Sequence, residues 1–264
     1  MSETPSKEDE LAGTEQPFVQ HLMELRDRLV KALIAIAIAA AILFFFPGPG
    51  ALYDFLAAPL VAHLPKGATL IATSVISPFM VPLKILLMSA FLLALPFVLW
   101  QVWAFVAPGL YSHEKKLVLP LVVSSTLLFF IGVAFCYYLV FGQVFAFIQS
   151  FAPKSITAAP DIEAYLSFVL SMFLAFGLSF EVPIAVVVLA RMGIVSVQKL
   201  REFRGYFIVI AFVIAAVVTP PDVVSQLSLA IPMCLLYEVG IWAAQIFIKH
   251  TKAPEEPEEP ASAS

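Results

Sequence analysis

Charged residues are scarce in this sequence. Asp, Glu, Lys and Arg make up 13% of its 264 residues, whereas hydrophobic residues make up 61%, and the mean hydropathy is +0.95. A soluble globular domain carries about 25% charged residues, so the composition excludes an ordinary soluble protein. Several apolar runs are long enough to cross a bilayer as helices, which takes about 20 residues. The sequence therefore predicts an α-helical membrane protein.

Cysteine and catalytic motifs are also nearly absent. The two cysteines, Cys136 and Cys234, lie inside apolar runs and are expected to be packing thiols. No Cys/His spacing fits a metal site, and no HExxH motif, phosphate-binding glycine loop or intramembrane Ser–His or Asp–Asp pair is present. We therefore expect no metal, no cofactor, no catalytic residue and no enzymatic activity.

The acidic residues that give the chain its net charge of −4 are concentrated at its two ends. Residues 1–16 are polar and acidic, which predicts a flexible segment and no cleavable signal peptide. Residues 249–264 are rich in Glu, Pro, Ala and Ser, which is typical of a disordered tail. The transmembrane domain is expected between them, over residues 17–248.

Six apolar runs predict six transmembrane helices, of which the last two are short. The fifth run has 14 residues and reaches only about 21 Å as a helix, against a hydrocarbon core of about 30 Å. Runs five and six are expected to span a locally thinned bilayer, and a re-entrant hairpin is the alternative. The predicted spans are residues 29–46, 79–107, 117–148, 164–190, 205–218 and 223–247.

The positions of the basic residues predict the orientation, because short loops rich in Lys and Arg stay in the cytoplasm. Twelve of the 15 Lys and Arg residues fall on one side of the predicted spans, and only Lys66, Lys84 and Lys154 fall on the other. Both termini are therefore expected in the cytoplasm. The twelve are Lys7, Arg26, Arg28, Lys31, Lys115, Lys116, Arg191, Lys199, Arg201, Arg204, Lys249 and Lys252.

Two carboxyl groups are expected at the cytoplasmic interface. Glu24 lies in the helical stretch HLMELRDRL before the first span, four residues before Arg28. Glu114 lies in the segment QVWAFVAPGLYSHEKK after the second span. From spacing alone, the first is better explained by a solvated amphipathic helix with local ion pairs, and the second by a surface loop beside aromatic residues.

Polar side chains inside the predicted spans are costly and therefore informative. Glu181 lies well inside the fourth span, and Pro183 frees the Ser179 carbonyl nearby. A protonated Glu181 that bonds this carbonyl is the structural interpretation. The functional one is a polar handle for another helix or a proton-carrying site. Gln226 and Glu238 in the last span are weaker cases.

The motifs resemble one family when they are taken together. The stretch HLMELRDRL, the segment QVWAFVAPGLYSHEKK, Phe180-Glu181-Val182-Pro183 and the turn TPPDVVSQ occur in order along residues 17 to 248 and are similar to signatures of the TatC family. Ser77-Pro78-Phe79 and Arg204-Gly205-Tyr206 are further matches.

This resemblance implies a receptor in the inner membrane with a concave bundle of helices. The family binds the twin-arginine signal peptides of folded precursors and, with the single-span subunits TatA and TatB, moves these precursors across the membrane by the proton-motive force. The positions that match its signal-peptide contacts are Glu24, Glu114 and Phe105, and those that match its partner-docking groups are Glu181 and Gln226. Membrane lipid and self-association in a receptor complex are expected, and nucleic acid is not.

Two other classes of protein compete with this hypothesis. An ion-coupled transporter would use Glu181 as a proton relay, but such folds usually contain internal repeats, and the motifs above each occur once. A structural scaffold would not need Glu24 and Glu114 beside aromatic residues at the interface.

Overall fold

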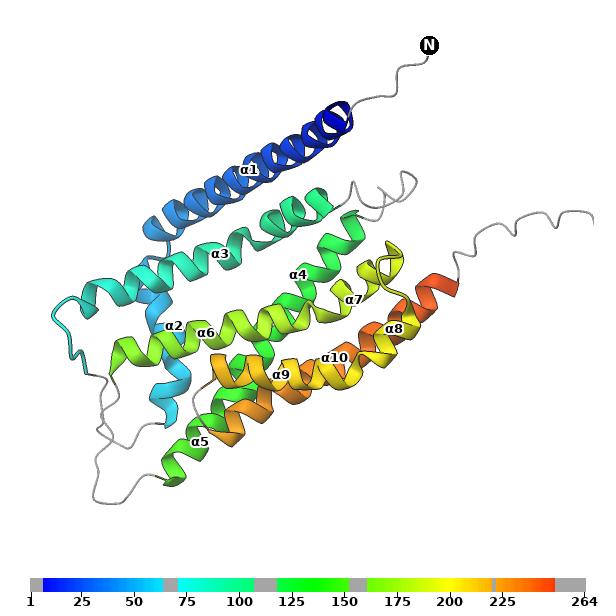
Figure 1. The fold of residues 1–264 in the computed structure, drawn as a ribbon. Coiled ribbons are helices and arrows are strands. Elements are labelled where there is room, and N and C mark those ends of the chain that lie inside the picture. The colour runs from blue at the N-terminus through cyan, green and yellow to red at the C-terminus, as the bar shows by residue number, and fades with distance from the viewer. Residues whose placement is uncertain (1–6, 64–70, 107–117, 152–160, 220–221, 250–264) are drawn as a thin grey trace, which may run out of the picture.

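The computed structural model describes residues 7–63, 71–106, 118–151, 161–219 and 222–249, and in them the chain is nearly all helical. Figure 1 shows the arrangement of the helices. Glu114 and the tail beyond Lys249 lie outside the described residues. The elements are α1 (Lys7–Phe45), α2 (Pro49–His63), α3 (Ser77–Val106), α4 (Val118–Phe135), a π-helical turn (Cys136–Val140), α5 (Phe141–Phe151), α6 (Ile162–Phe180), α7 (Val182–Arg191), α8 (Val197–Glu202), α9 (Arg204–Val218) and α10 (Val223–Lys249).

Five helical segments of the described residues are long and apolar enough to cross a membrane, and α9 is a shorter apolar helix. The chain is thus a multi-pass membrane protein, and six helices match the expected fold class. α9 has 15 residues, as short as expected. α10 has 27 residues, so the prediction that the last two helices are both short is wrong for α10. The five segments are Val19–Phe45, Ser77–Val106, Val118–Phe147, Ile162–Arg191 and Val223–Ile246.

Two of these segments change their helical geometry part of the way through. The π-helical turn joins α4 to α5, and a single turn residue, Glu181, separates α6 from α7. Pro183 explains the second break, because it has no N–H with which to bond the Ser179 carbonyl and continue the helix. Glu181 therefore lies where the backbone of the fourth span is interrupted.

The helices pack closely where their side chains are small. Ala39 of α1 lies against Ala90 and Ala94 of α3, and the two helices run side by side (Figure 1). On α4, Gly132 faces the Phe176 carbonyl, from which an added Cβ would be only 2.6 Å away. This residue lets α4 approach α6. The largest apolar core is centred on the π-helical turn, α5 and α6, and partly buried side chains of α4 pack against it.

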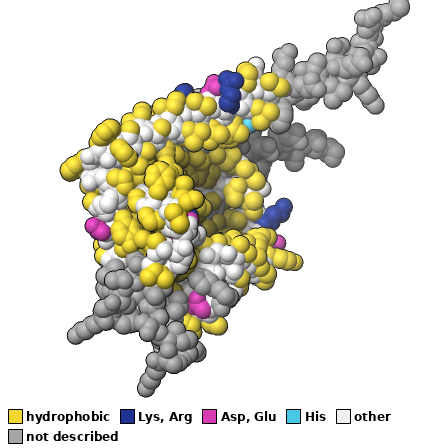
Figure 2. Space-filling view, turned by 90° about the vertical axis from the view of Figure 1, so that its left-hand side faces the viewer, with side chains coloured by type: hydrophobic (Ala, Val, Ile, Leu, Met, Phe, Trp, Pro, Cys, Tyr) yellow, Lys and Arg dark blue, Asp and Glu magenta, His cyan; other side chains and the backbone are white. Residues whose placement is uncertain are grey.

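The ends of the helices lie at two opposite sides of the molecule. Figure 1 places the beginnings of α1 and α4 and the ends of α3, α7 and α10 toward one side. The end of α1, the beginnings of α3 and α6 and the end of α5 lie toward the other. The first side, which carries the beginning of α1, is called the α1-start side below. The surface in Figure 2 is mainly apolar and hollowed in its middle.

Candidate functional site

Glu24 on α1 lies in a small cluster of charged and aromatic side chains. Its Oε1 accepts hydrogen bonds from Arg28 Nη2 at 2.6 Å and from Arg28 Nε at 3.0 Å, one helical turn further on. Oε2 lies 3.9 Å from His21 Nδ1, which is beyond a hydrogen bond. The Glu24 side chain is 35% exposed, so the carboxylate is accessible.

The end of α3 contributes an aromatic ring to the same cluster. The rings of His21 and Phe105 are stacked, with centroids 4.2 Å apart. The structure thus brings the surroundings of Glu24 and Phe105 together, although 81 positions separate them in the sequence. His21 itself was not predicted as a site residue. Its position three residues before Glu24 on a helix, and so on the same face, is the signal that could have identified it.

Glu114 lies outside the described residues, so its position near Glu24 stays a prediction.

The carboxyl group of Glu181 is enclosed at the break between α6 and α7. Both of its oxygens are buried and have no hydrogen-bond partner among the described residues. The hydroxyl of Ser125 on α4 lies next to it, and this hydroxyl accepts a hydrogen bond from Trp103 Nε1 of α3 at 2.9 Å. Side chains of three helical segments therefore converge on this acid.

The structural interpretation of Glu181 given above is wrong in one respect. A protonated carboxyl was expected to bond the Ser179 carbonyl that Pro183 leaves open, but neither carboxyl oxygen makes such a bond. The Ser179 hydroxyl instead donates to the Ala175 carbonyl at 2.7 Å. The reason is geometric, because the break turns the Glu181 side chain toward α4.

Gln226 and Glu238 hold α10 against α9. Gln226 Nε2 donates to the Phe212 carbonyl at 3.3 Å, and Glu238 forms an ion pair with Arg204 at 2.6 Å. Gln226 thus contacts α9, whereas the hydroxyl next to Glu181 belongs to Ser125 of α4.

A polar network that the sequence did not reveal lies at the side opposite the beginning of α1. Lys84 Nζ of α3 donates to Glu163 Oε1 of α6 at 2.8 Å, and the Ser77 hydroxyl donates to Glu163 Oε2 at 2.7 Å. Asp161 caps α6 and accepts from the Thr73 hydroxyl at 2.6 Å. This hydroxyl and backbone N–H groups lower the pKa of Asp161 to about 2. From the sequence, Lys84 was counted only among the three basic residues of the less basic side.

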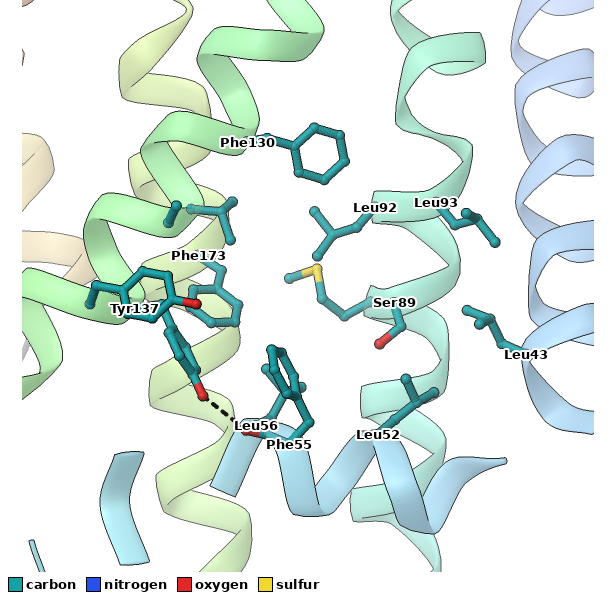
Figure 3. A pocket seen from close by; sticks show the side chains of 14 residues that line it. Leu43, Leu52, Phe55, Leu56, Ser89, Leu92, Leu93, Phe130, Tyr137 and Phe173 are labelled. Atoms are coloured by element: carbon teal, nitrogen blue, oxygen red, sulfur yellow. Dashed lines mark hydrogen bonds between the residues drawn. The ribbon is translucent and has the colours of Figure 1, made fainter. Parts of the chain in front are cut away.

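An apolar groove of about 480 Å³ lies between α1, α2, α3, α4 and α6. In Figure 3, α2 closes its lower end, and Tyr137 reaches down to the Phe55 carbonyl. The groove has no charged side chain among its lining residues. It therefore suits hydrocarbon rather than a polar ligand. The lining residues are Leu43, Leu52, Phe55, Leu56, Met88, Ser89, Leu92, Leu93, Phe130, Val133, Ala134, Tyr137, Tyr138 and Phe173.

Comparisons with known proteins identify the family. The family model of the Sec-independent protein translocase protein (TatC) matches residues 20–232. The TatC protein of Escherichia coli K12 is 47% identical over 241 residues, 91% of this chain and 93% of that protein. That of Haemophilus influenzae is 50% identical over 232 residues, 88% and 90% of the two chains.

A third relative is longer than this chain. The TatC protein of Halothiobacillus neapolitanus is 51% identical over 232 residues, which are 88% of this chain and 63% of the relative, so the match spans less than two thirds of that protein. Among solved structures, two crystal structures of the twin arginine translocase receptor TatC are 40% identical, with TM-scores of 0.75 and 0.76. The similarity covers 86% and 85% of this chain and 98% and 99% of those chains.

Proposed function

This chain belongs to the TatC family of Sec-independent protein translocase proteins, and from this membership we propose that it is the core receptor subunit of a twin-arginine translocase. It binds the twin-arginine signal peptides of folded precursors at its cytoplasmic face. Together with the single-span subunits TatA and TatB, it mediates their export across the inner membrane by the proton-motive force. It acts as a receptor and not as an enzyme.

The proposed orientation puts both termini and the α1-start side in the cytoplasm. Arg26, Arg28 and Lys31 lie in the first half of the apolar segment Val19–Phe45 of α1. Arg191 is the last residue of α7, and Lys199 lies in α8. The beginning of α1 and the end of α7 lie on the same side in Figure 1. Short basic segments are retained in the cytoplasm, which supports this assignment.

The carboxylate of Glu24 is the single feature that carries the proposal for recognition. Its Oε2 lies 3.9 Å from His21 Nδ1, beyond a hydrogen bond, and the carboxylate lies beside the stacked rings of His21 and Phe105. A guanidinium group binds a carboxylate through two parallel hydrogen bonds and stacks on aromatic faces. We assign one signal-peptide arginine to Glu24 with Phe105 nearby, and the second arginine to Glu114.

Glu181 and Gln226 are proposed as docking groups for partner helices. The oxygens of Glu181 are buried and have no hydrogen-bond partner among the described residues. When its side chain turns toward an incoming single-span helix, it offers a polar contact that hydrocarbon cannot provide. Gln226 already donates to α9 and would contribute its remaining hydrogen-bonding capacity.

A direct binding measurement tests the receptor assignment. The purified protein in detergent is titrated with a fluorescent twin-arginine peptide and with the matched peptide in which both arginines are lysine. We expect the arginine peptide to bind more tightly. Glu24→Gln should weaken it about tenfold or more, because a hydrogen bond to a charged group contributes about 1.5–3 kcal/mol.

Asp27→Asn is the matched control, because Asp27 lies on the same helix and pairs with Arg26. It should leave binding close to that of the unmodified protein. Equal binding of both peptides would contradict the receptor assignment, and unchanged binding by Glu24→Gln would remove Glu24 from the site.

A further inference from the structure

Arg28 occupies one half of the carboxylate that the proposed function assigns to the signal peptide. Two of its nitrogens donate to the same oxygen, Glu24 Oε1, at 2.6 and 3.0 Å. The other oxygen, Oε2, lies 3.9 Å from His21 Nδ1, beyond a hydrogen bond. The Arg28 side chain is 24% exposed, whereas that of Arg26, two residues earlier, is 70% exposed.

This geometry conflicts with full recognition of an incoming arginine. A guanidinium binds a carboxylate best when two N–H groups meet both oxygens, and Arg28 already fills the acceptor sites of Oε1. An arriving arginine finds only Oε2 open. It also approaches a second guanidinium of the same charge across a short distance.

We propose that Arg28 is an internal competitor for Glu24, which a signal-peptide arginine must displace to reach both carboxylate oxygens. This inference rests on the proposed function, because it concerns the same site. Arg28 then limits the affinity of the receptor and speeds the release of the peptide. A receptor that passes its cargo to a translocation step needs such release.

Competition at one oxygen affects arginine and lysine differently. A lysine ammonium is a point charge that needs only one carboxylate oxygen, and Oε2 can supply it without moving Arg28. An arginine gains a second hydrogen bond only after Arg28 leaves. Removal of Arg28 should therefore favour the arginine peptide over the lysine peptide, and not strengthen both equally.

The test is Arg28→Met, which keeps an unbranched side chain of similar length but removes the charge and the donors. We expect the twin-arginine peptide to bind about three- to tenfold more tightly, a modest gain because the pair is partly exposed. Most of the gain should appear as slower dissociation. The lysine peptide should gain less, so that the ratio of the two affinities rises.

Arg26→Met is the matched control, because it removes the same charge from the same helix without touching Glu24. It should not raise the ratio of affinities. In a Glu24→Gln background, Arg28→Met should give no selective gain for arginine, since the contested carboxylate is absent.

If Arg28→Met bound the arginine peptide more weakly than the unmodified protein does, Arg28 would be needed to orient Glu24. That result would overturn the proposal. An effect equal to that of Arg26→Met would overturn it as well. Failure of the proposed function is distinguishable, because the unmodified protein would then not prefer the arginine peptide at all.

Discussion

Glu181 has both carboxyl oxygens buried without a hydrogen-bond partner among the described residues, which is costly in a membrane span. The sequence identified the residue, because an acid inside an apolar run is conspicuous. It could not identify the surroundings, because Ser125 and Trp103 come from other helices. The groups that could stabilise a buried acid depend on tertiary packing and leave no local pattern.

Replacement of Glu181 by Gln or Ala tests the docking proposal. Gln can donate and accept hydrogen bonds as a neutral carboxyl does, so Glu181→Gln should keep substantial export and crosslinking to partner helices. Glu181→Ala should lose partner crosslinking about tenfold, an estimate for one buried polar contact, and still bind signal peptide. Site-specific crosslinking and an export assay in cells measure both effects.

Signal-peptide binding is the internal control for folding in both variants. A proton relay predicts a different pattern, because a relay needs a group that titrates and Gln does not. Complete loss of export in both variants with partner crosslinks intact would contradict docking and favour the relay.

At the scale of the elements, a hydrogen bond from Tyr137 of the π-helical turn holds α2 in place, and the sequence did not predict it. Position 59 of α2 is proline and has no N–H for the Phe55 carbonyl four residues earlier. Tyr137, in the π-helical turn, supplies the missing donor to this carbonyl at 3.1 Å, and its ring stacks on Phe55 with centroids 5.6 Å apart. Tyr165 donates to the adjacent Leu56 carbonyl at 3.3 Å.

Tyr137→Phe removes this donor and keeps the ring. We expect it to destabilise the packing of α2 by about 0.5–1.5 kcal/mol, the net value of one hydrogen bond. Amides of α2 should then exchange with deuterium about two- to tenfold faster, as mass spectrometry would measure.

The neighbouring Tyr138 provides the control, because its side chain is 75% exposed and Tyr138→Phe should leave exchange in α2 unchanged. Pro59→Ala restores the backbone N–H, so Tyr137→Phe should cost less in that background. An equal effect of Tyr137→Phe with and without Pro59 would contradict this explanation.

Local sequence predicted which segments are helical better than how they bend and end. Pro183 indicates the break beside Glu181, because proline has no N–H to continue the hydrogen bonds of the helix. The π-helical turn at Cys136–Val140 has no proline or glycine within it and could not be expected from the sequence. Both of the last two helices were expected to be short, but α10 has 27 residues and only α9, with 15, is short.

At the scale of the whole molecule, the apolar runs predicted a membrane protein of six helices. The positions of Lys and Arg predicted which of its loops face the cytoplasm. The family resemblance assigned Glu24 and Phe105 to one site, but the stacking of His21 on Phe105 was not predicted, because it requires α1 and α3 to pack in one register. The boundaries proposed between terminal segments and the membrane domain stay predictions. α1 begins at Lys7, inside the N-terminal segment.

The orientation of the molecule can be tested with single cysteines at exposed positions, in a background in which Cys136 and Cys234 are alanine. Val75 is 98% exposed on the side of the Lys84 network, and Ile194 is 61% exposed beyond α7. If the basic α1-start side is cytoplasmic, Val75→Cys should react with a membrane-impermeant thiol reagent in intact cells. Ile194→Cys should react only after the membrane is permeabilised. The reverse pattern would invert the proposed orientation.

Val223→Cys, at the 65% exposed first residue of α10, separates the two arrangements of α9 and α10. Labelling from outside, as for Val75, indicates that both helices span a thinned bilayer, whereas protection from the reagent on both sides indicates the re-entrant hairpin.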